Sequence, residues 1–170
     1  MNSGIGKHII RFILLIMLQV FVLNNINLGG YINPYIYILF ILLLPASMNK
    51  SGVLILAFLT GMTIDVFGNT PGLHAAATVF MAYFRPSVLK LFFQNIEFSG
   101  SDEAGPSNIG LGDFFRYTLV LVFLHHCVLF TLEVFSFTNM LFTLYSILLS
   151  TLVTTFLIMV IVMFFSKRKA

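Results

Sequence analysis

The sequence predicts an all-α integral membrane protein with about six transmembrane helices and both termini in the cytoplasm. Hydrophobic residues make up 59% of the 170 residues and charged residues only 9%, whereas a soluble domain carries about 25% charged residues. The apolar residues gather in runs near the length of about 20 residues that a helix needs to cross the hydrocarbon core. The basic residues fall on one predicted side of the bilayer. This composition excludes a soluble enzyme, a nucleic-acid-binding domain and a disordered tail.

The spans follow one another in a single polytopic domain, residues 1–170. The first span ends at a cluster of asparagines, and Pro34 is well placed to begin the second. A dense turn signal, residues 68–72, separates the third span from the fourth. The one long polar stretch, 95–112, is expected to be a solvated cytoplasmic loop in which Asp102 and Glu103 carry no chemistry. The expected spans are 9–28, 31–48, 52–68, 73–94, 113–135 and 140–165.

The distribution of basic residues predicts the orientation. With six spans, the turns around 24–34, 68–72 and 136–139 lie on one side, and they contain no Lys or Arg. The positive-inside rule therefore makes the opposite side cytoplasmic. The basic residues on that side are Lys7, Arg11, Lys50, Lys90, Arg116, Lys167, Arg168 and Lys169.

Asp65 and His74 flank the turn between the third and fourth spans. A charged group at bilayer depth is expensive, so Asp65 needs an explanation. One interpretation is that Asp65 caps the turn through Asn69 and Thr70; the other is that it anchors a polar cluster that binds a partner or a ligand. A hydrogen bond between Asp65 and His74 would hold the hairpin closed, and the pair is interpreted mainly as structural.

His125 and His126 lie near the middle of the fifth span, and Glu133 lies two turns beyond His126 on the same helical face. We expect the histidines to be a buried, hydrogen-bonded pair. His126 and Glu133 can also join Asp65 and His74 in one inward-facing cluster. Adjacent helical side chains point about 100° apart, and the HExxH motif is absent. An intramembrane metalloenzyme built on His125, His126 and Glu133 is therefore a minor alternative, and no cofactor or metal is expected.

Two further polar features lie inside spans. Arg85 precedes Pro86, which kinks the fourth helix; Arg85 is expected to extend to the cytoplasmic headgroups or to donate to carbonyls that the kink loosens. In the last span, small residues at four-residue spacing let helices approach closely. They predict a packed bundle, with a partner helix as one candidate occupant. These residues are Ser146, Ser150 and Thr154.

The hairpin of the third and fourth spans carries a more specific pattern. Residues 61–74 read GMTIDVFGNTPGLH, which is a Gly-x-x-x-Asp helix end, a turn, and a Leu-His helix start. This pattern resembles the hallmark hairpin of the MreD family of bacterial rod-shape-determining membrane proteins. The residues that carry the resemblance are Asp65, Asn69, Pro71, Gly72 and His74, and those similar to the Bacteroidota branch of the family are Arg85, His125, His126 and Glu133.

The resemblance implies a fold similar to that of the substrate-binding subunits of energy-coupling-factor transporters, and a place in the bacterial cytoplasmic (inner) membrane. It implies a non-enzymatic subunit of the cell-elongation complex that binds the MreC scaffold and supports lateral peptidoglycan synthesis and rod shape. The implied partners are an MreC-like scaffold, a RodA-like glycosyltransferase with its transpeptidase, MreB filaments and membrane lipids, with no nucleic acid. A scaffold helix would dock on a small-residue face such as that of Ser150.

The rival interpretation is a vitamin-binding subunit of an energy-coupling-factor transporter. Members of that class resemble one another in an Ala-x-x-x-Ala stripe on the first helix, which docks the coupling subunit. Span 9–28 contains no alanine, and the first alanine of the chain is Ala46. The sequence thus weighs against this alternative, which tight binding of a vitamin would restore.

Overall fold

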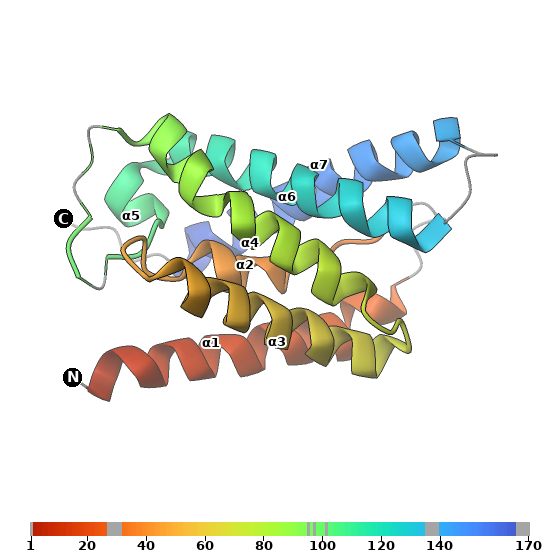
Figure 1. The fold of residues 1–170 in the computed structure, drawn as a ribbon, viewed down its shortest axis with the longest axis horizontal. Coiled ribbons are helices and arrows are strands. Elements are labelled where there is room, and N and C mark those ends of the chain that lie inside the picture. Colours follow the sequence, from red (N-terminus) through yellow and green to blue (C-terminus); the bar gives the residue numbers. More distant parts are fainter. Residues whose placement is uncertain are drawn as a thin grey trace.

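The computed structural model describes residues 2–26, 32–94, 96, 98–100, 102–134 and 140–165, with the side chains described from residue 6 onward, and it contains no strand within those ranges. The five long helices run along one common direction, and the first turn of α1 lies at the same end of the molecule as the last turn of α7 (Figure 1). The elements are α1 (Asn2–Phe21), η1 (Leu23–Asn25), α2 (Ile38–Leu42), α3 (Lys50–Gly68), α4 (Leu73–Phe92), α5 (Pro106–Ile109), α6 (Leu111–Val134) and α7 (Met140–Phe165).

Four helical segments in the described part of the chain are long and apolar enough to cross a membrane: Gly6–Asn25, Lys50–Gly68, Leu111–Val134 and Met140–Phe165. Their outward side chains are large and apolar, as expected for surfaces that face lipid. α4 has 20 residues but is less apolar, because it contains His74, Arg85 and Lys90. The chain is therefore an all-helical protein with the helices of a membrane protein.

The described part of the second expected span, 31–48, is not one continuous helix, so the prediction of a regular helix there was wrong. Its only regular helix is α2, which has five residues. Yet every residue from Ile36 to Leu42 is at most 5% exposed, because this segment runs through the interior of the bundle (Figure 1). An apolar run does not distinguish a lipid-facing helix from an irregular buried segment. Residues 32–45 are called the central segment below.

Irregular backbone at membrane depth is tolerated only where the surrounding protein satisfies its polar groups. Side chains of the first and last long helices do this for the central segment. Gln19 of α1 accepts a hydrogen bond from Ile36 N at 2.8 Å and donates to Pro34 O at 3.0 Å. Thr154 Oγ1 of α7 accepts from Tyr35 N at 3.1 Å. The helices thus replace the hydrogen bonds that a regular helix would have made within itself.

The stretch 95–112 is not simply a solvated loop, contrary to expectation. Its described part pairs with the end of the central segment: Glu103 bridges to Pro45, and Ala46 N donates to Asp102 O at 2.9 Å. Ala104 and Ile109 are 0% and 6% exposed. The segment therefore packs against one end of the bundle.

α3 and α4 form a tight hairpin. A Cβ added at Gly61 would lie 2.4 Å from Cα of Ala75, which is far inside van der Waals contact. Only glycine lets the two backbones approach this closely. The close approach sets the position of the turn that carries Asp65.

Candidate functional site

Asp65 ties the end of α3 to the beginning of α4. Its carboxylate Oδ1 accepts from Thr70 Oγ1 and His74 N, both at 3.0 Å, and Oδ2 accepts from Ala75 N at 2.9 Å. The two backbone N–H groups belong to the first turn of α4, where no intrahelical acceptor exists. The cap position of α4 is Gly72, which has no side chain. Asp65 therefore supplies from the preceding helix the acceptor that Gly72 lacks.

The turn itself depends on two left-handed residues. Asn69 has φ 53° and Gly72 has φ 84°, and these are the residue types that adopt this conformation most readily. Asn69 contributes its backbone, since its N–H donates to the Asp65 carbonyl oxygen. Pro71 is exposed at the tip. These residues shape the turn.

The expected side-chain bond between Asp65 and His74 does not form, because the carboxylate is taken up by backbone N–H groups. The His74 ring turns inward instead, and its Nδ1 lies 3.0 Å from the hydroxyl oxygen of Tyr37. The same hydroxyl lies 2.7 Å from His125 Nε2. Tyr37, on the central segment, thereby links α4 to α6. The Tyr37 cluster comprises Tyr35, Tyr37, His74, Thr78, His125 and His126.

His125 and His126 are both fully buried and hydrogen-bonded, as expected, but their partners are other residues. Their ring centroids lie 5.4 Å apart. His126 Nδ1 lies 2.7 Å from Val122 O, and its Nε2 lies 3.4 Å from Thr154 Oγ1. Because adjacent residues leave a helix in different directions, each histidine faces a different neighbour.

Glu133 does not join this buried cluster, because it is exposed near the end of α6. Within the described ranges, no three His, Cys, Asp or Glu side chains are grouped so that they could hold a metal ion. In the Tyr37 cluster, His74 Nδ1, His125 Nε2 and both ring nitrogens of His126 meet a hydroxyl or a carbonyl oxygen. His125 Nδ1 is buried without a hydrogen-bond partner among the described residues. The cluster thus cross-links α4, α6, α7 and the central segment.

The small-residue stripe of α7 faces inward. Ser146, Ser150 and Thr154 are 5%, 0% and 0% exposed. Ser150 Oγ accepts from Asn33 N at 3.1 Å, next to the bond that Thr154 makes with Tyr35 N. The expected docking of a partner helix on this stripe is therefore excluded, because the chain's own central segment covers it.

Arg85 neither extends to the membrane surface nor donates to carbonyls of its own helix, which continues through Pro86. It is 1% exposed, and its Nε donates to the Tyr117 hydroxyl at 2.9 Å. Its Nη2 donates to Leu44 O, and its Nη1 lies 3.4 Å from Pro45 O. The guanidinium has five donors in a planar fork, which suits several carbonyls at once. Arg85 therefore fixes the end of the central segment between α4 and α6.

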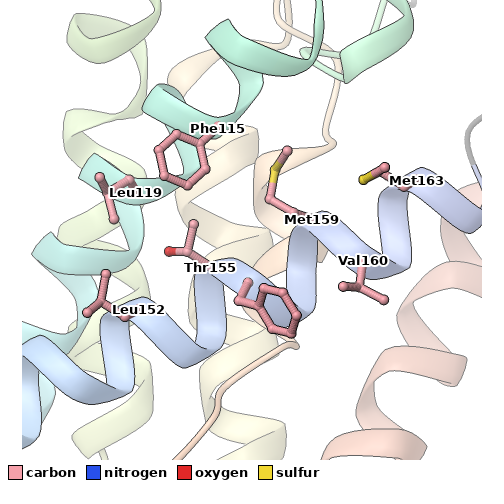
Figure 2. Close-up of a pocket in the computed structure, with 8 residues that line it drawn as sticks. Phe115, Leu119, Leu152, Thr155, Met159, Val160 and Met163 are labelled. Carbon is pink, nitrogen blue, oxygen red and sulfur yellow. The ribbon is translucent and has the colours of Figure 1, made fainter.

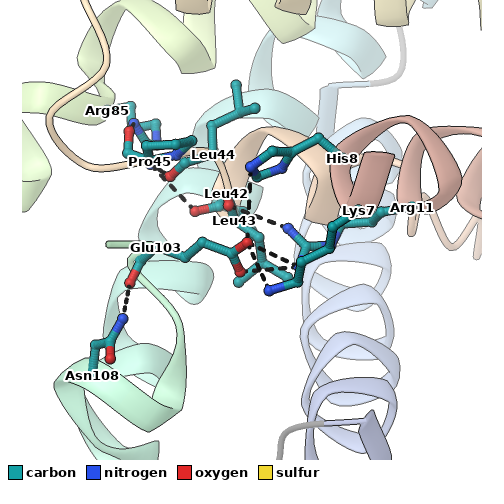
Figure 3. Close-up of polar contacts among 10 residues, drawn as sticks. All are labelled: Lys7, His8, Arg11, Leu42, Leu43, Leu44, Pro45, Arg85, Glu103 and Asn108. Carbon is teal, nitrogen blue, oxygen red and sulfur yellow. Dashed lines mark hydrogen bonds and ion pairs between the residues drawn. The ribbon is translucent and has the colours of Figure 1, made fainter. Parts of the chain in front are cut away.

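A charged group lies at the same end of the bundle, around Glu103 (Figure 3). Arg11 Nη2 lies 3.2 and 3.0 Å from the two carboxylate oxygens of Glu103, and Lys7 Nζ lies 3.0 Å from Oε1. Burial acts to raise the pKa of Glu103, but the hydrogen bonds and positive charges of Arg11 and Lys7 outweigh it and hold the pKa below its ordinary value. Glu103 is thus an ionised anchor between α1 and the segment that precedes α5.

A shallow apolar cleft of about 540 Å³ lies between α6 and α7. Figure 2 shows Thr155 and Leu152 on α7, with Leu119 and Phe115 on the neighbouring α6. Thr155 is 1% exposed, and its hydroxyl has no hydrogen-bond partner among the described residues. The cleft is lined by Phe115, Leu119, Leu152, Thr155, Phe156, Met159, Val160 and Met163.

Four interior residues were not predicted from the sequence: Gln19, Tyr37, Glu103 and Tyr117. Polarity could have indicated two of them, because Gln19 and Glu103 are polar residues beside or within apolar runs. Tyr37 and Tyr117 gave no signal, because tyrosine is equally common at membrane interfaces.

No family model, curated protein or solved structure matches this chain. The class that the fold defines is an all-helical protein in which four helical segments of the described residues meet the length and hydropathy of a membrane span.

Proposed function

We propose that this chain is a non-enzymatic membrane subunit of the bacterial cell-elongation complex, similar to MreD, which binds an MreC-like scaffold and supports lateral peptidoglycan synthesis and rod shape. The observation that carries the proposal is the hairpin of residues 61–74. Gly61 allows the contact of the two helices, Asp65 caps α4, and Asn69 and Gly72 form the turn. The motif that resembles the family hallmark is thus one structural unit, as a scaffold-binding subunit requires.

The proposed placement is the bacterial inner membrane, with six crossings and both termini in the cytoplasm. The central segment makes the second crossing inside the bundle, and α4 makes the fourth. The end that carries Lys7, Arg11 and Lys50 then faces the cytoplasm, by the positive-inside rule. The Asp65 hairpin lies at the opposite end (Figure 1) and faces the periplasm.

The α6–α7 cleft replaces the Ser150 stripe as the docking face for the scaffold's transmembrane helix. Leu152 and Phe156 on its rim are 58% and 66% exposed, so a helix can pack on them. The rim residues are apolar and exposed, so the cleft offers an apolar surface of defined shape to a single helix.

The test is capture of the MreC-like scaffold of the native organism by the purified chain, with cell shape as a second readout. Leu152→Trp fills the cleft and should abolish capture and fail to restore rod shape after depletion. Ile55→Trp is the matched control, because Ile55 is an apolar residue of α3 that is 60% exposed.

Two results distinguish failure of the docking face from failure of the function. Equal capture by Leu152→Trp and Ile55→Trp would show that the scaffold docks elsewhere. Normal rod shape after depletion, combined with a vitamin requirement, would refute the elongation role and favour a transport subunit.

A further inference from the structure

A groove of about 1490 Å³ lies between α1 and the end of α7. α1 forms one wall, and its side chains there are widely exposed: Ile10 is 61%, Leu14 is 60% and Phe21 is 65% exposed. Ile161 and Phe165 of α7 form the opposite wall, and Leu39 of the central segment lines the groove as well. A membrane helix with such a face requires an apolar occupant in the groove.

The side chains of the groove favour acyl chains over a protein helix. Helices in membranes pack closely through small residues. Here the walls are large and branched or flexible, and the small residues Gly6, Gly105 and Ser107 occur at one end of the groove. Acyl chains adapt to such irregular walls, whereas a helix does not.

The length of the apolar wall also fits a lipid. From Ile10 to Phe21 the wall is about 16 Å long at the rise of an α-helix. One leaflet of the hydrocarbon core is about 15 Å thick, and a transmembrane helix needs about twice that. The groove therefore matches the acyl chains of a single leaflet.

The polar end of the groove, at Lys7, Arg11 and Glu103, carries a net positive charge. Arg11 and Glu103 form a close ion pair, and each side chain is 16% exposed. Lys7 also contacts Glu103, but its side chain is 60% exposed. Two cations against one carboxylate leave one positive charge, and it is accessible on Lys7. An ammonium group has three donors, so Lys7 can bind a phosphate and still keep its ion pair with Glu103.

We propose that the α1–α7 groove is a binding site for an anionic phospholipid, with its phosphate at Lys7 and its acyl chains along α1. Lys7 supplies the charge complement, and Ser107 lies at the same end of the groove. The Arg11 guanidinium is less available to a phosphate, because it pairs with Glu103 and also donates to Leu43 O at 3.3 Å (Figure 3). The lipid would cover the face of α1 that the protein leaves exposed. This proposal does not depend on the elongation role.

The test is native mass spectrometry of the purified full chain, exchanged into mixed micelles of phosphatidylglycerol and phosphatidylcholine. Wild-type protein should retain phosphatidylglycerol preferentially. Lys7→Gln should lower the affinity for it about five-fold, the factor for one basic residue at a membrane surface, and Lys7→Arg should keep it. Lys50→Gln is the matched control, because Lys50 is an exposed lysine at the same end that lies over the Tyr83 ring. Equal losses in Lys7→Gln and Lys50→Gln would overturn the proposal.

A photo-reactive amino acid at position 14 identifies the occupant directly in native membranes. A crosslinked product with the mass of the chain plus one phospholipid supports the proposal. A crosslinked second copy or another protein overturns it. Thermal unfolding of each variant in detergent establishes that it is folded.

Discussion

Replacing Asp65 by Ala should destabilise the protein by about 3 kcal/mol. The substitution removes the acceptor of His74 N and Ala75 N, and both groups lie at a buried helix start. Loss of an N-cap acceptor costs about 0.5–2 kcal/mol, and a hydrogen bond to a charged acceptor contributes about 1.5–3 kcal/mol. The contact with Thr70 is partly exposed and adds less. These contributions share one carboxylate, so their sum is an upper bound.

The assay is thermal unfolding of the purified chain in one detergent, followed by circular dichroism at 222 nm. A loss of about 3 kcal/mol should lower Tm by roughly 6–12 °C for a chain of this size. Thr70→Val is the control, because it removes the hydroxyl and leaves both backbone contacts; it should lower Tm by only a few degrees, about 1 kcal/mol or less. Equal losses from the two variants would refute the capping role of Asp65.

Three further predictions concern packing, pH and the buried cation. Gly61→Ala should cost at least about 1–3 kcal/mol, because its Cβ meets the backbone of α4, while Gly112→Ala should be nearly neutral, since nothing lies within 4 Å; unfolding temperatures compare them. The pKa of Glu103 is lowered in the folded state, so its contribution to stability is present at neutral pH and lost as pH falls through the acid range. This loss occurs below the ordinary carboxyl pKa, so Glu103→Gln should show a smaller loss of Tm between pH 7 and pH 3 than wild type. Arg85→Lys should lose about 1–3 kcal/mol, because an ammonium cannot reach the Tyr117 hydroxyl and the carbonyls together, and Tyr117→Phe should lose less.

The long helices were predictable because hydropathy and length decide them locally. Span 52–68 corresponds to Lys50–Gly68, 113–135 to Leu111–Val134, and 140–165 to Met140–Phe165. Asn49 caps α3 through its side chain, which is the kind of local signal that a sequence displays. Boundaries differed by a few residues where a helix continues beyond the apolar run.

The central segment and the polar contacts were not predictable in the same way. Residues 31–48 have the composition of a span, and only their position inside the bundle allows an irregular backbone. The partner of His74 is Tyr37, 37 positions away in the chain, and no spacing rule reports such a contact. The polar stretch 95–112 led us to expect a solvated Glu103. Its ion pair is with Arg11 of α1, which is 92 positions away in the chain.

Seven buried polar side chains of the long helices share one physical role. A non-helical segment inside a membrane protein exposes backbone groups that water cannot satisfy. Each long helix except α3 contributes a polar side chain to the central segment, by hydrogen bonds to its backbone or to Tyr37. With these groups engaged inside, the outer faces of the bundle are left to apolar contacts with lipid or partner helices. The contributing side chains are Gln19, His74, Arg85, Tyr117, His125, Ser150 and Thr154.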